Sequence, residues 1–249
     1  MNMFINIVNL FSILFIFMFR CTMNMFETKL PTKKCHDKLA QVSWYLIEQP
    51  FSPGDPDSLT SHLVSVEENP WAGTMGDVDW NHPIGNLYRI GADRKPVKMA
   101  EKICCSNGIG WSPDNKTMYF CESFAHVIHA YDFDAATGDI ANRRPFTTVN
   151  TESFPDGLTV DAEGFVWSAQ PVFGRIVRYD PAGKMERIIE LPVSRGTSVM
   201  FGGPNLDTLY VTTMRTTLED AQLAEEPLAG CLLAIKPGVR GIAEAPFAG

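Results

Sequence analysis

Four copies of a two-strand pattern recur along this chain, and this repeat limits the fold more than any other feature. Each copy has one strand with a hydrophobic or aromatic pair, and a following strand in which apolar residues lead into a turn. The pairs begin 48, 48 and 43 residues apart, at Trp71, Tyr119, Trp167 and Tyr210. The following strands are expected at residues 85–91, 126–132, 174–180 and 230–236. A repeat of this length is typical of stacked structural units.

Three of the copies also have an earlier strand that opens with a turn. These strands are expected at residues 106–111, 155–160 and 197–201. Asn, Asp and Gly at residues 113–116 and 161–164 supply the backbone conformations of the hairpins that follow. Three or four antiparallel strands in a unit of about 40 to 50 residues are typical of a propeller blade. We therefore predict an all-β chain that forms a β-propeller with about four recognisable blades. A helical solenoid or a β-sandwich would not repeat in this way.

The net charge argues against a nucleic-acid-binding surface. The 249 residues carry a formal charge of −8, whereas binding to phosphates needs clustered Lys and Arg. A small neutral or anionic solute is the expected ligand. The hydrophobic fraction of 45 % is enough for a substantial core. The six cysteines show neither CxxC spacing nor the density of a disulfide scaffold, so we expect mostly reduced thiols.

Residues 1–65 contain no copy of the repeat and are expected to form an atypical N-terminal segment, with the propeller domain at residues 66–249. Residues 3–19 carry no charge and reach the lower limit of a membrane span. They lack a basic start and a small-residue cleavage site. An uncleaved anchor, an atypical signal peptide and translated sequence that is not native coding sequence all stay open. Residues 50–61 are rich in Pro and Asp and are expected to be a linker.

Asn107 and Asp156 occupy equivalent positions of two repeats, and each is followed by glycine. The innermost strand of each propeller blade starts near one mouth of the central channel, so these side chains are expected to converge. An amide oxygen and a carboxylate suit a Ca²⁺, Mg²⁺, Mn²⁺ or Zn²⁺ ion. Asn-Gly and Pro-Asp-Gly are also common turn sequences. Their equivalence within the repeat favours one divalent metal ion, held by Asn107 and Asp156.

Five tracts from residue 106 onward carry a family resemblance. They are SNGIGWSPDNKTMYF, YDFDAATGDIANRR, FPDGLTVDAEGFVW, FGGPNLDTLYVTT and GVRGIAEAPFAG. In this order they resemble the gluconolactonase, regucalcin (senescence marker protein) and luciferin-regenerating-enzyme family, and the resemblance covers about residues 71–249. It implies a six-bladed propeller that binds one divalent metal ion at the channel mouth and hydrolyses sugar lactones and related esters.

By this resemblance Asn107 and Asp156 match two of the family's three metal ligands, and Asp156 also matches its catalytic base. The third ligand is a Glu in the family's first blade, and no matching stretch occurs in this chain. The family's Arg and Asn that contact substrate just before the WAGTM tract have no counterpart either. Asp77 and Asp79 fall where the family has an acidic loop that faces the substrate. They are expected to bind substrate, with solvated loop carboxylates as the alternative.

Several other chemically active side chains are expected to be structural. His126 and His129 are three residues apart on a predicted strand, so they face opposite ways and do not share a metal ion. Ser198 occupies the third equivalent repeat position, where packing is expected rather than a hydrogen bond to a metal-bound water. The thiols without a paired His are expected to pack in the core: Cys104, Cys105 and Cys121.

The expected function is metal-dependent hydrolysis of sugar lactones or related esters, with Asp156 accepting a proton from water. A non-catalytic calcium-binding protein is the alternative. The resemblance implies a small-molecule lactone as partner and a cytoplasmic location. Residues 3–19 would instead anchor the chain in a membrane or export it, if they are a targeting segment. The match lacks roughly two of the family's blades, so open sheet edges are expected to cause aggregation or dimerisation.

Overall fold

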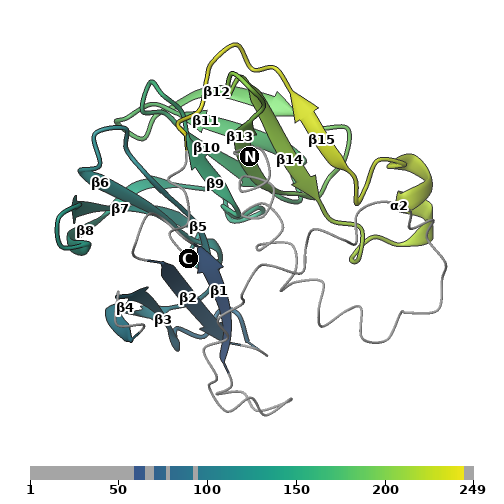
Figure 1. Cartoon of the computed structure of the whole chain (residues 1–249). Helices are drawn as coiled ribbons and strands as arrows, with labels where there is room; N and C mark the ends of the chain where they lie inside the picture. Colours follow the sequence, from purple (N-terminus) through teal and green to yellow (C-terminus); the bar gives the residue numbers. More distant parts are fainter. Residues whose placement is uncertain (1–58, 65–69, 77–78, 92–94, 244–249) are drawn as a thin grey trace, which may run out of the picture.

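The computed structural model describes residues 59–64, 70–76, 79–91 and 95–243, and for residues 59–64 it describes the backbone only. These residues fold into four antiparallel sheets, three with four strands and one with three (Figure 1). In each sheet the strands lie side by side in the order of the chain. This is the arrangement of propeller blades, and the prediction of an all-β propeller with four recognisable blades is confirmed.

The strands of the four sheets have the following bounds. The first sheet contains β1 (Leu59–Val64), β2 (Trp71–Gly76), β3 (Gly85–Ile90) and β4 (Pro96–Ile103). The second contains β5 (Ser106–Trp111), β6 (Thr117–Glu122), β7 (Val127–Asp134) and β8 (Asp139–Thr148). The third contains β9 (Leu158–Val160), β10 (Val166–Gln170), β11 (Arg175–Tyr179) and β12 (Met185–Glu190). The fourth contains β13 (Gly196–Gly202), β14 (Thr208–Thr213) and β15 (Leu232–Ile235). Two short helices complete the described elements, η1 (Ser123–Ala125) and α2 (Asp220–Glu225).

The first strands of the sheets lie next to one another around the centre of the molecule. β1 contacts β5, β5 contacts β9, and β9 contacts β13, although each pair belongs to two different sheets (Figure 1). The apolar pairs of the repeat fall in the second strands β2, β6, β10 and β14. Side chains there are buried because the strand has a neighbour on each side and a sheet packs on its face. Trp71 and Trp167, for example, are 1 % and 0 % exposed.

The hydrophobic core lies between neighbouring sheets. Trp71 of β2 meets Trp111 of β5, with ring centroids 6.3 Å apart. Trp167 of β10 meets Phe201 of β13 edge to face, with centroids 5.9 Å apart. A third buried cluster joins the second and third sheets around Leu158. Aromatic pairs in these geometries add to the stabilisation from burial, so each blade is held by the next one along the chain.

The hairpin between β9 and β10 is fixed by a fully buried carboxylate. Asp161 Oδ1 accepts hydrogen bonds from the backbone amides of Glu163 and Phe165, both at 3.0 Å. Its Oδ2 accepts bonds from Trp167 Nε1 at 2.8 Å and Arg178 Nη2 at 2.7 Å. The Asp of the predicted hairpin therefore closes the turn and neutralises a buried guanidinium. Both carboxylate oxygens of Asp161 accept hydrogen bonds inside the blade, so this residue has a structural role.

The first sheet begins before residue 66. β1 pairs with β2 along its whole length, so part of the segment 1–65 belongs to the first sheet. Residues 3–19 and most of the expected linker lie outside the described residues, and the division of the chain at residue 65 stays a prediction. None of the helices in the described part of the chain is long and apolar enough to cross a membrane.

Candidate metal and catalytic site

Asn107 and Asp156 meet where the second and third blades begin. Asn107 is the second residue of β5, and Asp156 lies two residues before β9. The Gly108 amide donates a hydrogen bond to the Asp156 carbonyl oxygen at 3.2 Å. The Asn107 side chain lies near the Asp156 carboxyl group and favours its ionised form. The structure thus brings together the two residues that the repeat paired, although 49 residues separate them in the sequence.

This close approach depends on the two glycines that follow Asn107 and Asp156. A Cβ atom at Gly108 would lie 2.7 Å from the Asp156 carbonyl oxygen, and one at Gly157 would overlap the Ser198 side chain. Atoms of real side chains do not approach so closely. The glycines are therefore required because neighbouring inner strands are in contact, and not only because a turn favours them.

Burial controls the charge of Asp156. The residue is 9 % exposed, and this desolvation raises the pKa of Asp156 from 3.8 to about 7. The Asn107 side chain and the Gly157 amide favour the ionised carboxylate and oppose the rise of the pKa only in part. Among the ion pairs between described residues, none includes Asp156. A carboxyl group with a pKa near 7 can accept and release a proton at neutral pH.

The donor atoms of this pair fit a hard divalent cation. Asp156 supplies a carboxylate and Asn107 a side-chain carbonyl oxygen, which are ligand types of Ca²⁺ and Mg²⁺. A cation between them would provide the positive charge that the buried carboxylate lacks. Within the described residues, no third His, Cys, Asp or Glu joins them in a metal-binding cluster. The pair therefore fits a metal ion as a set of two protein ligands, with water in the remaining positions.

The third equivalent position around the channel belongs to Thr197. The Gly157 amide donates a hydrogen bond to the Thr197 carbonyl oxygen at 2.9 Å. The Gly108 amide donates to the Asp156 carbonyl oxygen in the same way. The assignment of this position to Ser198 is wrong by one residue, because a bulge shifts the register between Gly196 and Ser198. Ser198 is 1 % exposed and packs against Gly157, so its expected packing role is confirmed.

The predicted acidic loop lies between β2 and β3. Asp77 is outside the described residues. Asp79 is exposed, and its Oδ1 accepts a hydrogen bond from the Asn81 amide at 3.0 Å. The Asn81 carbonyl oxygen in turn accepts a bond from the Cys104 thiol at 3.2 Å, just before β5 begins. The loop thus lies against the segment that leads to Asn107, and a role of Asp77 or Asp79 in binding substrate stays a prediction.

A buried carboxylate that sequence reasoning missed lies at the end of β6. Glu122 is 3 % exposed, and its Oε2 lies 2.9 Å from His129 Nε2 and 2.5 Å from Arg143 Nη2. Its Oε1 accepts the Cys104 amide at 3.0 Å. Burial alone would raise the pKa of Glu122, but His129, the Cys104 amide and Arg143 together lower it. The contact arises only when β6, β7 and β8 pair, so no short motif indicates it.

His126 does not lie on a strand. It follows η1 in the left-handed region with φ of 54°, and its Nδ1 lies 2.8 Å from the Ser153 carbonyl oxygen. The prediction of one strand containing both His126 and His129 is wrong, because β7 begins only at Val127. The two imidazoles have different partners, since His129 contacts Glu122.

Cys105 and Cys121 are buried thiols, as expected, whereas Cys104 is only partly buried and Cys231 is exposed. Burial raises the pKa of Cys105 to about 12 and the pKa of Cys121 well above its ordinary value. Cys104 is half-buried, and desolvation raises its pKa as well. These three and Cys231 are free thiols, and the other two cysteines lie outside the described residues. Raised pKa values leave little thiolate, so none of the three is suited to nucleophilic attack.

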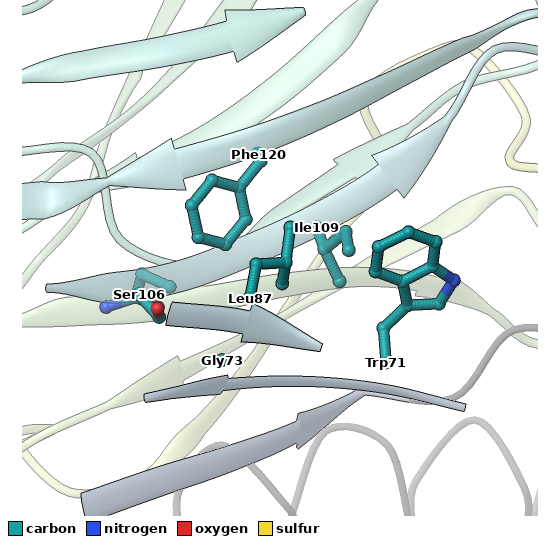
Figure 2. Close-up of a pocket in the computed structure, with 7 residues that line it drawn as sticks. Trp71, Gly73, Leu87, Ser106, Ile109 and Phe120 are labelled. Atoms are coloured by element: carbon teal, nitrogen blue, oxygen red, sulfur yellow. The ribbon is translucent and has the colours of Figure 1, made fainter. Parts of the chain in front are cut away.

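A small pocket lies between the first and second blades. Asn107 lines it, whereas Asp156 belongs to the third blade and does not. Figure 2 shows Leu87, Ile109 and Phe120 close together, with Ser106 near one end and Trp71 near the other. The lining residues are Trp71, Gly73, Leu87, Ser106, Asn107, Ile109 and Phe120. Most of these side chains are apolar members of the core between the two sheets, so the pocket is a packing gap and not the reaction site.

Comparison with known proteins decides the family. A family model described as SMP-30/Gluconolactonase/LRE-like region matches residues 63–215. The chain belongs to this family. Regucalcin of Gallus gallus is 39 % identical over 168 residues, which are 66 % of this chain and 56 % of that protein. The chain therefore spans just over half the length of this relative, and the predicted family resemblance is confirmed.

Solved structures of similar proteins have the same fold. A luciferin-regenerating enzyme is 33 % identical, with a TM-score of 0.65, over 75 % of this chain and 65 % of that chain. A regucalcin from Agrobacterium tumefaciens, described as a calcium-binding protein, is 28 % identical with a TM-score of 0.70. That match covers 76 % of this chain and 65 % of the other.

The SMP-30/gluconolactonase match contains every site residue predicted from the sequence. Asn107, Asp156, Asp77 and Asp79 all lie within residues 63–215. Membership of this family explains the blades, while the chemistry available to the chain depends on the side chains at the channel mouth.

Proposed function

We propose that this chain holds one divalent metal ion at the channel mouth and hydrolyses lactones or related carboxylic esters there. The observation that carries the proposal is the buried Asp156 carboxyl group, which lies beside Asn107 where the second and third blades begin and has a pKa raised to about 7. Membership of a family whose description includes gluconolactonase supports it. Sugar lactones are the first substrates to test.

The residues of the chain would move one proton during the reaction. Near pH 7 a large fraction of Asp156 is ionised, so its carboxylate can accept a proton from water while the water oxygen bonds to the lactone carbonyl carbon. The ring C–O bond then breaks, and Asp156 returns the proton to the leaving alkoxide. The product is the open hydroxy acid. The nearby Asn107 side chain favours the ionised form of the carboxyl group.

Asn107 and Asp156 would also hold the metal ion. The amide oxygen of Asn107 is a ligand, while its NH₂ group stays available to donate to Asp156. A bound divalent ion polarises a carbonyl group and lowers the pKa of water. Its charge would also lower the pKa of Asp156, so more of the carboxylate would be ionised at neutral pH.

A non-catalytic calcium-binding protein is the second candidate. The similar structure from Agrobacterium tumefaciens is described as calcium-binding. In the described residues Asn107 and Asp156 have no third acidic, His or Cys neighbour that completes a metal cluster. Such a protein would bind Ca²⁺ weakly at the same pair and would not turn over lactones.

One experiment separates the two candidates. The full chain is treated with EDTA, and acid release from D-glucono-δ-lactone is followed at constant pH while Ca²⁺, Mg²⁺, Mn²⁺ or Zn²⁺ is added. We expect a metal-dependent rate that falls at least about 100-fold in Asp156→Asn. Asn107→Ala should need more metal for the same rate, and the exposed control Asp220→Asn should match the wild type.

The opposite results are equally clear. Metal binding by calorimetry without hydrolysis of gluconolactone, γ-valerolactone or γ-phenyl-γ-butyrolactone would select the second candidate. Hydrolysis that is as fast in EDTA, or as fast in Asp156→Asn, would contradict the proposed site.

A further inference from the structure

Three aromatic side chains from separate loops form a row that leads to Asp156. Trp80, in the loop between β2 and β3, has its ring centroid 5.5 Å from that of Phe124 in η1. Phe124 stacks on Phe154, with centroids 5.3 Å apart and an interplanar angle of 22°. Phe154 is two residues before Asp156. The row therefore connects the loop of the first blade with the segment before β9 that contains Asp156.

Buried hydrogen bonds hold these loops together. Ser123 Oγ donates to the Pro155 carbonyl oxygen at 2.7 Å. His126 Nδ1 lies 2.8 Å from the Ser153 carbonyl oxygen, and Ser153 Oγ donates to the Pro171 carbonyl oxygen. Both serines are 0 % exposed. The β6–β7 loop, the segment before β9 and the β10–β11 loop are thus tied into one preformed surface.

The β10–β11 loop adds an aliphatic side chain in an unfavourable conformation. Val172 follows Pro171 and has φ of 75°, a region that β-branched residues rarely adopt. Its side chain is nevertheless 46 % exposed, so burial of the valine does not explain the strain. Strain of this kind is retained mainly at ligand-binding loops and active sites. Trp80, at the other end of the row, is 37 % exposed.

The side chains of the aromatic row itself are apolar, while the exposed polar groups Asp79 and Asn81 lie beside Trp80 in the loop. The hydroxyl groups of Ser123 and Ser153 and the Nδ1 atom of His126 already bond to backbone carbonyl oxygens. They are not available for the hydroxyl groups of a sugar. Aromatic faces bind flat rings by offset stacking and shield them from water. We call the exposed and half-buried apolar side chains of this surface the mouth rim: Trp80, Phe124, Phe154 and Val172.

We infer that the mouth rim binds an aryl substituent of the substrate, so that the preferred substrate is an aryl-substituted lactone and not a bare sugar lactone. The inference rests on the proposed hydrolysis at Asp156, and it names the class of lactone that this site prefers. The reacting carbonyl lies at Asp156 while the aryl ring stacks along the aromatic row.

Two lactones with the same ring and the same type of leaving alcohol test this preference. γ-Phenyl-γ-butyrolactone carries an aryl group where γ-valerolactone carries a methyl group. Each kcat/KM is divided by the rate of alkaline hydrolysis, which removes the intrinsic reactivity. For the full chain we expect a phenyl-to-methyl ratio of at least about ten.

Variants of the mouth rim and a matched control show whether the rim causes the phenyl-to-methyl ratio. Trp80→Ala and Val172→Gly should lower the phenyl-to-methyl ratio towards one. Val172→Gly also relieves the left-handed strain, so its melting temperature should not fall, and a lost preference cannot then be ascribed to a lost fold. Val97→Ala is the control, because Val97 on β4 is 45 % exposed like Val172 but lies away from the rim loops. It should leave the ratio unchanged.

Binding of the corresponding γ-lactams separates this inference from the proposed hydrolysis. These cyclic amides hydrolyse very slowly, so calorimetry measures their affinity without turnover. We expect the γ-phenyl lactam to bind about tenfold more tightly than the γ-methyl lactam, and Trp80→Ala to abolish the difference. That result without hydrolysis of any lactone would support the rim and contradict the proposed function. Equal or undetectable binding of the two lactams would overturn the inference, whatever the lactonase activity.

Discussion

Asp156 should destabilise the chain at neutral pH when no metal is bound, and Asp156→Asn should remove this cost. The pKa of Asp156 is about 7 in the folded chain against 3.8 as its ordinary value. Between these pH values the folded state binds more protons than the unfolded state. The free energy of unfolding of the wild type therefore falls as the pH rises through this window and stays low above it. The neutral Asn has the same shape and does not titrate.

The size of the effect follows from the pKa difference. Each pKa unit corresponds to about 1.36 kcal/mol, so the full cost above pH 7 is on the order of 4 kcal/mol. Relaxation and water penetration around the charge reduce it, and we expect about 2 to 4 kcal/mol. Well below pH 3.8, Asp156 is protonated in both states and the advantage of Asn disappears.

Urea unfolding in EDTA at pH 5 and at pH 8 measures this difference. Asp156→Asn should be more stable than the wild type at pH 8, and its advantage should shrink by about 2 to 3 kcal/mol at pH 5. Added Ca²⁺ or Zn²⁺ should stabilise the wild type and not the variant, because ligands that bind only the folded state raise its stability. The exposed control Asp220→Asn should show no such pH dependence. A variant that is no more stable than the wild type at pH 8 would refute the reasoning.

Three other substitutions test other parts of the structure. Asp161→Ala leaves the Arg178 guanidinium buried without its main partner, so urea unfolding should show a loss of about 3 to 5 kcal/mol; a loss below about 1 kcal/mol would contradict the buried pair. Gly157→Ala forces a Cβ atom against Ser198, so thermal melting should show a large drop in Tm, and a wild-type Tm would show that the inner strands are not in contact. The pKa of Glu122 is lowered from 4.5. The ionised Glu122 therefore adds to the free energy of unfolding above pH 4.5, and this stabilisation is lost as the pH falls through the folded-state pKa. Glu122→Gln should therefore be less stable than the wild type at pH 7 but equal at acidic pH, and a constant difference at both pH values would be inconsistent with this titration.

The blades could be predicted from the sequence because their packing requires apolar residues at regularly repeated positions. Each second strand is covered on its faces and flanked on both sides, so it buries large apolar residues such as Trp71 and Trp167. Asn107 and Asp156 were found for a related reason. The glycine after each is required by the contact between inner strands, and that requirement repeats with the blades.

Features that depend on strand register or on loop conformation could not be predicted from the sequence. β1 was missed because its sequence carries no copy of the repeat, and it is recognised only through its pairing with β2. Thr197 was displaced by the bulge in β13. Glu122 and His129 are seven residues apart with an intervening turn, and only the β6–β7 pairing brings them together. The stacking of Phe124 on Phe154 likewise joins two loops whose sequences show no pattern.

The most direct test of the central claim is the position of a bound metal ion. Crystals of the full chain grown with Mn²⁺ and measured for anomalous scattering would locate the ion without assumptions about the protein. We expect one peak at the channel mouth, within about 2.6 Å of a side-chain oxygen of both Asn107 and Asp156, and we expect Asp156→Asn to abolish it. A peak elsewhere, or a peak at the mouth that survives this substitution, would show that Asn107 and Asp156 do not form the metal site.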